Sequence, residues 1–167
     1  MGVSTSQTFD ATFFNRYVTS EYYLSRGASG NVYGPIQWND LQLAIKQTTF
    51  AAGKVTEELN KDIEVKKDIL ASIEHEHLIR IHLVDLNQLP KAMFIVMEFA
   101  AGGSLHGALK SLGGPGQKLP IDVVTDWAKQ IAEGMLYLHE KHIVHRDLKS
   151  SNSEWINKMF CICKFVL

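Results

Sequence analysis

The stretch His145-Arg146-Asp147-Leu148-Lys149-Ser150-Ser151-Asn152 is the most informative part of this 167-residue sequence. A long helix is predicted to lead into it, because Leu119-Pro120 is a typical helix start and the apolar residues that follow recur at steps of three and four. These apolar residues are Val124, Trp127, Ile131, Met135 and Leu138. Their spacing indicates a core helix that delivers its C-terminal end to the loop at His145.

The part of the chain before this helix has the pattern of strands. Short extended or alternating apolar runs indicate strands, whereas residues 55–73 have apolar residues at helical spacing. The predicted strands are residues 22–24, 31–33, 41–47, 81–86 and 93–99, the last two as an antiparallel pair. Residues 1–20 show no clear period and are predicted as a leader of uncertain order. Strands first and helices afterwards indicate an α+β fold with two segregated layers, joined near residues 98–103.

The composition argues against several classes of function. Seventeen basic and eighteen acidic residues give a net charge of −1, so no global positive field favours nucleic acid as a partner. The two cysteines, Cys161 and Cys163, have no second cluster to complete a zinc site and are interpreted as free thiols. No signal peptide and no apolar run of about 18 residues is found, which predicts a cytoplasmic protein. Residues 1–6 fit a loose N-myristoylation pattern that is too short to carry an argument.

A glycine-bearing turn is predicted between the first two strands, within Ser25-Arg26-Gly27-Ala28-Ser29-Gly30-Asn31-Val32. Glycines in such a turn allow backbone N–H groups to approach phosphate oxygens closely, although an ordinary hairpin turn gives the same pattern. The next strand becomes continuously apolar at residues 43–45 and ends in Lys46. A lysine there is costly unless an anion meets it, and the alternative is a strand-end lysine that reaches water.

Residues 21–152 resemble a eukaryotic protein kinase domain of the serine/threonine type. Five features occur in the family order. The first is a glycine turn similar to G-x-G-x-x-G-x-V, with Ser25 in place of the first glycine, and the second is Leu43 to Lys46, which is similar to V-A-I-K. The helix at residues 55–73, the strand and linker between lobes at residues 94–105, and the H-R-D-L-x-x-x-N loop at residues 145–152 follow. The linker and residues 126–139 are most similar to the mixed-lineage kinases, which act as MAP kinase kinase kinases.

This resemblance implies a bilobal fold. The β-rich N-lobe, with one inserted helix, would occupy residues 21–97 and the hinge residues 98–103. An incomplete helical C-lobe would occupy residues 104–152. The oligomeric state is left open by the sequence.

The resemblance also assigns roles to individual residues. Asp147 would accept the proton of the substrate hydroxyl, Lys149 is the residue type of serine/threonine kinases, and Asn152 would help to hold Mg²⁺. Lys46 would contact the phosphates of ATP. The adenine would lie in an apolar slot. Leu24, Val32 and Ala44 would sandwich the ring, with Met97 at the gatekeeper position, and the backbone of Glu98 to Ala100 would hydrogen-bond the adenine edge. The backbone of the turn at Gly27 and Gly30 would approach the phosphates.

One position departs from the family pattern. Anchoring the pattern on Leu70, Ile73 and His75 puts Lys66 where the family has a glutamate that pairs with the strand lysine, and the helical stripe gives the same position. Two lysines would converge there, which predicts a destabilised active arrangement unless ATP or Asp62 intervenes. A shifted helix register is the alternative.

Residues 153–167 are predicted as a divergent tail. No aspartate follows Glu154, so the metal-holding Asp-Phe-Gly of the family is not found and the domain is predicted to be truncated after the loop. The sequence thus predicts a serine/threonine kinase by family, acting on proteins in a MAP-kinase-type cascade, with little or no activity of this chain alone.

The alternative is a non-catalytic, pseudokinase-like fragment or isoform. Such a chain would bind nucleotide or protein partners, the latter through exposed apolar patches around Trp127 and the tail. An error in the gene sequence after Asn152 is a further alternative.

Overall fold

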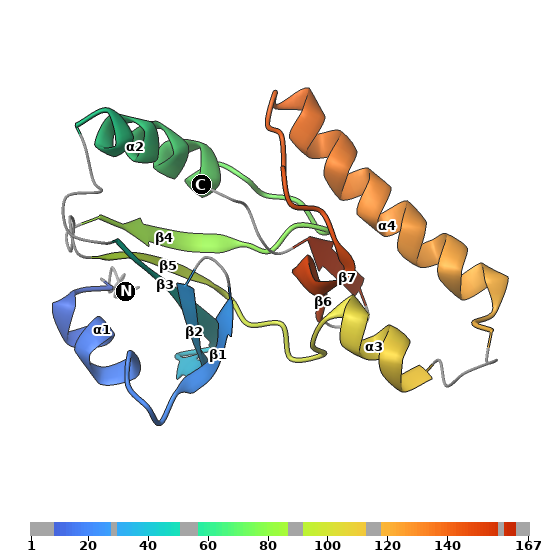
Figure 1. Ribbon diagram of the computed structural model, residues 1–167, viewed down its shortest axis with the longest axis horizontal. Helices are drawn as coiled ribbons and strands as arrows, with labels where there is room; N and C mark the ends of the chain where they lie inside the picture. The colour runs from blue at the N-terminus through green and yellow to red at the C-terminus, as the bar shows by residue number, and fades with distance from the viewer. Residues whose placement is uncertain are drawn as a thin grey trace, which may run out of the picture.

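The computed structural model of the protein describes residues 9–27, 30–50, 57–86, 92–112, 118–156 and 159–162. The N-terminal part is a sheet with helices packed on it, and the C-terminal part consists of two helices and a short hairpin (Figure 1). Strands come first and the helices of the second part follow, so the predicted α+β class is confirmed.

Five antiparallel strands make up the sheet, in the spatial order β1-β2-β3-β5-β4. Their bounds are β1 Tyr23–Gly27, β2 Gly30–Trp38, β3 Leu41–Thr49, β4 Ile81–Asp85 and β5 Ala92–Glu98. The predicted antiparallel pair of the last two strands is confirmed, with Val84 opposite Ile95. β2 runs well beyond the predicted residues 31–33 because its second half pairs with the first half of β3.

β3 lies in the middle of the sheet and is buried on both faces, which explains its continuous apolar run. Leu43 and Ile45 have no exposed surface and belong to a core cluster on the first face of the sheet. Ala44 and Lys46 alternate with them and face the other side. Lys46 is only 7% exposed, so it is not a strand-end lysine that reaches water.

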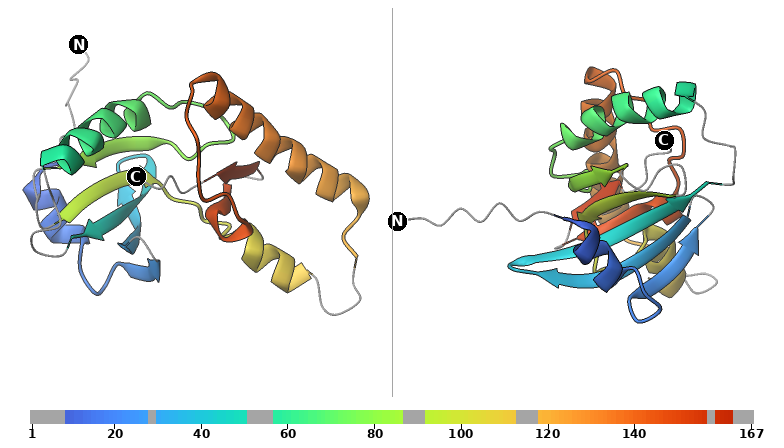
Figure 2. Two further views of the ribbon diagram at one scale, coloured as in Figure 1. Left: turned by 45° about the horizontal axis from the view of Figure 1, so that its top comes forward. Right: turned by 90° about the vertical axis from the view of Figure 1, so that its left-hand side faces the viewer.

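A short aromatic helix, α1 (Ala11–Tyr17), covers the first face of the sheet (Figures 1 and 2). Phe13, Phe14 and Tyr17 are buried there, and the ring of Phe14 stacks on Phe94 of β5 with centroids 4.6 Å apart. The N-terminus of the helix is capped by Asp10, whose carboxylate accepts a hydrogen bond from the Phe13 N–H at 3.0 Å.

This helix is not anticipated by the sequence, which leaves the order of residues 1–20 uncertain. Seven residues are too few to show a clear helical period, but three large rings bury enough apolar surface to fix the segment on the sheet. Residues 1–8, which include the myristoylation pattern, lie outside the described residues.

The second face of the sheet packs against α2 (Glu57–Ala71) and the C-terminal half of α4 (Ile121–Glu140). Leu70, Ile73, Ile95 and Leu138 share one buried cluster. The predicted helix at residues 55–73 is confirmed over 57–71.

The predicted long helix is confirmed by α4, but its faces differ from the prediction. Leu138 and Trp127 are buried, whereas Val124 is 41% exposed, because the described elements cover only one side of the helix. Trp127 itself is only 8% exposed, whereas Ile121 and Val124 on the preceding turns are 78% and 41% exposed, so the apolar surface near Trp127 does not include its own side chain. A second helix, α3 (Leu105–Leu112), connects the linker to α4.

Two polar contacts tie the N-terminal part to α4. The imidazole of His77, in the connection between α2 and β4, lies 3.2 Å from the Glu133 carboxylate. The hydroxyl of Tyr137 accepts a hydrogen bond from the Glu74 N–H at 3.4 Å. These contacts and the Leu138 cluster hold the sheet against the helix that leads into the 145–152 loop.

The chain after this loop continues as folded structure. A 3₁₀ turn at Ser150–Asn152 is followed by β6 (Ser153–Ile156), which pairs antiparallel with β7 (Met159–Ile162) near α4 (Figure 1). The segment predicted as a divergent tail from residue 153 therefore begins with a hairpin. Among the described residues, no helix combines the length and the apolar character needed to cross a membrane.

Candidate active site

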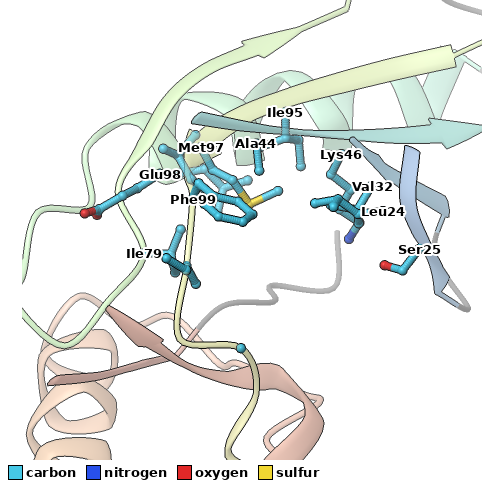
Figure 3. A pocket seen from close by; sticks show the side chains of 15 residues that line it. Leu24, Ser25, Val32, Ala44, Lys46, Ile79, Ile95, Met97, Glu98 and Phe99 are labelled. Atoms are coloured by element: carbon cyan, nitrogen blue, oxygen red, sulfur yellow. The ribbon is translucent and has the colours of Figure 1, made fainter. Parts of the chain in front are cut away.

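A cavity of about 310 Å³ lies under the second face of the sheet, beside the linker that follows β5 (Figure 3). Strands β1, β2, β3 and β5 supply its roof, and the connection between α2 and β4 supplies a further wall. Seven of the nine residues predicted to bind ATP line it: Leu24, Val32, Ala44, Lys46, Met97, Glu98 and Ala100. The sequence prediction thus located residues that the fold brings together from four strands and the linker.

The walls of this cavity are mainly apolar, with a polar side chain at one end. Lys46 reaches into the cavity from β3, whereas Figure 3 shows the carboxylate of Glu98 directed away from it. The cavity is therefore amphipathic: its linker end suits a flat apolar group and its Lys46 end suits an anion.

The backbone of the linker is partly committed to the protein itself. The Glu98 N–H donates to the Arg80 carbonyl at 3.0 Å, and the Phe99 N–H donates to the Gln42 carbonyl at 2.9 Å. The linker then turns at Gly103, whose φ of +71° favours glycine, and the Gly103 N–H donates to the Ala100 carbonyl at 3.3 Å. Two of the N–H groups at the predicted adenine edge thus point into the protein.

Gly27 and Gly30 close the β1–β2 hairpin, where they pair with each other, and Gly30 does not line the cavity. Residues 28 and 29 between them lie outside the described residues. Gly30 has a φ of +134°, and a Cβ added to it would lie 2.0 Å from the Gln47 carbonyl oxygen. In this structure, glycine is thus required at residue 30 by the close approach of β3.

The 145–152 loop brings its three predicted functional side chains into direct contact. The Lys149 ammonium lies 2.8 Å from the Asp147 carboxylate. The Asn152 side-chain amide donates to both the carboxylate and the backbone carbonyl of Asp147, each at 2.7 Å. The hydrogen bond from Lys149 and the one from Asn152 hold the pKa of Asp147 below its usual value. Asp147 is therefore a carboxylate at neutral pH, with its charge partly offset by Lys149.

The first two residues of this loop, His145 and Arg146, have an unusual environment and an unusual backbone conformation, respectively. His145 is 1% exposed, and its Nδ1 accepts a hydrogen bond from the Asp147 N–H at 3.3 Å. Burial lowers the pKa of His145, and the Asp147 charge opposes this shift only in part. Arg146 has a φ of +66°, a left-handed conformation that is uncommon for a residue with a Cβ. Such strained backbone is concentrated at functional sites.

Several further residues line the cavity that the sequence did not assign to it. Leu70, Ile79, Ile81 and Ile95 contribute apolar surface, and Ser25, Ala101 and Gly103 also line the cavity. Phe99, within the predicted backbone range 98–100, lines it as well. The alternation of β5 predicts Ile95 on the face of Met97, but the positions of Ile79 and Ile81 depend on how the connection after α2 folds back. The side chains of Lys66 and Asp62 lie outside the described residues, so the predicted convergence of two lysines stays a prediction.

Comparison with protein families matches residues 18–156 to the protein kinase domain. This match includes β6, the first four residues of the predicted tail. The chain is similar to mitogen-activated protein kinase kinase kinase 10 of Xenopus laevis, with 36% identity over 75% of this chain and 12% of that protein.

It is also similar to mitogen-activated protein kinase kinase kinase 7 of Drosophila melanogaster, with 34% identity over 84% of this chain and 20% of that protein. The cytokinesis protein sepH of Aspergillus terreus is 28% identical over 77% of this chain and 9% of its own length. The matched region is thus at most a fifth of each of these relatives.

Proposed function

The chain belongs to the protein kinase family and is a serine/threonine kinase by family, and on this premise we propose that it binds ATP in the cavity under the sheet. The observation that carries the proposal is the buried Lys46 at one end of a mainly apolar cavity. An adenine ring at the linker end would place the phosphates toward Lys46. The lobes that flank this site are proposed at residues 21–97 and 104–152, with the hinge at residues 98–103.

The linker backbone suggests how the adenine would be held. The N–H groups of Glu98 and Phe99 already donate within the protein, so the Glu98 carbonyl and the Ala100 N–H are the groups we assign to the adenine edge. Val32 and Ala44 come from neighbouring strands of the roof and would cover one face of the ring. Met97, at the predicted gatekeeper position, would limit the depth of the slot.

The 145–152 loop supports the proposed phosphoryl transfer. An ionised Asp147 can accept the proton of a serine or threonine hydroxyl, and Lys149 beside it would offset negative charge near the transferred group. Asn152 uses its amide NH₂ on Asp147, which leaves its side-chain oxygen as the atom for Mg²⁺. Bound magnesium would supply neutralisation of phosphate charge.

We further propose that the substrates are proteins of a MAP-kinase-type cascade in the cytoplasm. The support is the similarity to two mitogen-activated protein kinase kinase kinases at 34% and 36% identity. For the 167-residue chain by itself we expect little transfer, because residues 155–167 contain no carboxylate side chain.

The test combines a binding and a transfer measurement on the whole chain. ATP affinity is measured by isothermal titration calorimetry for the wild type and for Lys46→Met, and we expect the variant to bind at least about tenfold more weakly, because a charge-assisted contact is lost. Lys110→Met, on the exposed surface of α3, is the matched control and should bind ATP like the wild type.

Radiolabelled phosphate transfer to a generic protein substrate is compared between the wild type and Asp147→Asn. No measurable ATP binding by the wild type would refute the proposed function. Binding that depends on Lys46, without transfer that depends on Asp147, would support the non-catalytic alternative of a nucleotide-binding module.

A further inference from the structure

The cavity has a second polar side chain, Ser25, at the position where the family pattern has a glycine. Ser25 lies on β1, lines the cavity and is exposed at its mouth. Figure 3 shows its hydroxyl turned toward the side of the cavity on which Lys46 lies. The other lining side chains among the described residues are apolar, apart from Lys46 and the outward-turned Glu98.

A β-bulge is the reason that Ser25 faces the cavity. Tyr23 pairs with Tyr33 and Ser25 pairs with Val32, so two steps along β1 correspond to one step along β2. Leu24 is the extra residue. In a regular strand, Leu24 and Ser25 would point to opposite faces, but the bulge allows both to line the cavity. A bulge that re-aims a side chain is a common device beside binding sites.

The strand register then places Ser25 in one row with Lys46. Ser25 is opposite Val32, and Val32 is opposite Lys46. Paired residues of neighbouring antiparallel strands project to the same face, and the strands lie about 4.8 Å apart, so Ser25 and Lys46 are separated by roughly 10 Å across the roof. Ser25 and Lys46 are thus the two polar ends of this row, with Val32 between them.

We propose that Ser25 is a specificity-determining residue, whose hydroxyl donates a hydrogen bond to an oxygen atom in the sugar–phosphate half of the nucleotide. This inference rests on the proposed binding of ATP. A glycine at the same position offers no side-chain donor, so the serine gives this chain a contact that the usual pattern lacks. Both a ribose hydroxyl and a phosphate oxygen present the acceptor that the Ser25 hydroxyl requires.

The experiment measures the affinities of ATP, adenosine and adenine by isothermal titration calorimetry for the wild type, Ser25→Ala, Ser25→Gly and Ser25→Thr. Loss of one hydrogen bond should weaken ATP binding by about three- to tenfold in the alanine and glycine variants. The threonine variant keeps the hydroxyl and should bind within threefold of the wild type. Ser111→Ala, an exposed serine of α3 whose hydroxyl donates to the Ala108 carbonyl, makes the same chemical change away from the cavity and should have no effect.

The three ligands locate the contact. A loss with ATP but not with adenosine assigns the bond to a phosphate, whereas an equal loss with both assigns it to the ribose, and either result supports the proposal. Adenine should bind all variants equally. An equal loss with adenine would show that the substitution acts through the shape of the cavity, and would overturn the proposal.

The remaining outcomes separate this inference from the proposed function. If the wild type binds ATP and neither Ser25→Ala nor Ser25→Gly weakens binding threefold, the Ser25 assignment fails while ATP binding stands. Failure of Ser25→Thr to retain the affinity would also overturn it. If the wild type binds none of the three ligands, both proposals fall.

Discussion

Replacing Gly30 by alanine should destabilise the protein far more than a single methyl group usually does. The added Cβ would lie 2.0 Å from the Gln47 carbonyl oxygen and 2.9 Å from the carbon of that carbonyl, both backbone atoms of β3. Moving them would disturb the central strand. The φ of +134° adds backbone strain of about 1–3 kcal/mol for a residue with a Cβ, and overpacking adds about 1–3 kcal/mol. We expect a total loss near 3–4 kcal/mol.

Differential scanning calorimetry provides the assay. A loss of about 3 kcal/mol corresponds to a fall in Tm of roughly 6–12 °C for a chain of this size. Gly103→Ala is the matched control, because Gly103 also has a positive φ, +71°, but a Cβ added there meets no atom within 4 Å. It should lose only the backbone strain, about 1–2 kcal/mol. If both variants lowered the Tm equally, the contact with β3 would not be what requires glycine at residue 30.

Three further predictions concern the loop and the core. Lys149→Met should raise the pKa of Asp147, because the main cause of its lowering is removed; carbon-detected NMR titration measures this, and Lys129→Met should leave that pKa unchanged. His145 has a folded-state pKa below its unfolded value, so its contribution to the free energy of unfolding is full above about pH 6.5 and falls as the pH drops toward the folded pKa. His145→Asn keeps an acceptor for the Asp147 N–H, and its free energy of unfolding, measured by urea titration, should depend less on pH over that window. An unaltered dependence of this free energy on pH would contradict the lowered pKa of His145. Leu138→Ala should lower the free energy of unfolding by about 2–5 kcal/mol in the same assay, since Leu138 has no exposed surface. The control Leu136→Ala, at a side chain that is 59% exposed, should lower it by less than about 0.5 kcal/mol. Equal losses would show that the core does not include α4.

The features that depend on local sequence were predictable. A continuous apolar run indicates the buried strand β3, two apolar runs separated by a short segment indicate the antiparallel pair of β4 and β5, and a helical period indicates α4. The contacts among Asp147, Lys149 and Asn152 likewise involve residues close in the chain, so a motif of eight residues is enough to anticipate them.

The features that depend on tertiary placement were not predictable. Ile79 and Ile81 line the cavity because the connection after α2 folds back under the sheet, which no local pattern encodes. The inward direction of Ser25 requires the bulge at Leu24, which is a feature of the pairing between β1 and β2 and not of either strand alone. The exposure of Val124 depends on which side of α4 other elements cover.

The aromatic helix α1 has a practical consequence for the preparation of this protein. The family match begins at residue 18, so an expression fragment designed from the match would omit Phe13, Phe14 and Tyr17. The sheet face that these rings cover would then expose Phe94 and Val96 to water. Apolar patches of this kind promote self-association. A recombinant boundary placed before Phe9 should therefore give a monodisperse sample where a boundary at residue 18 gives an aggregating one.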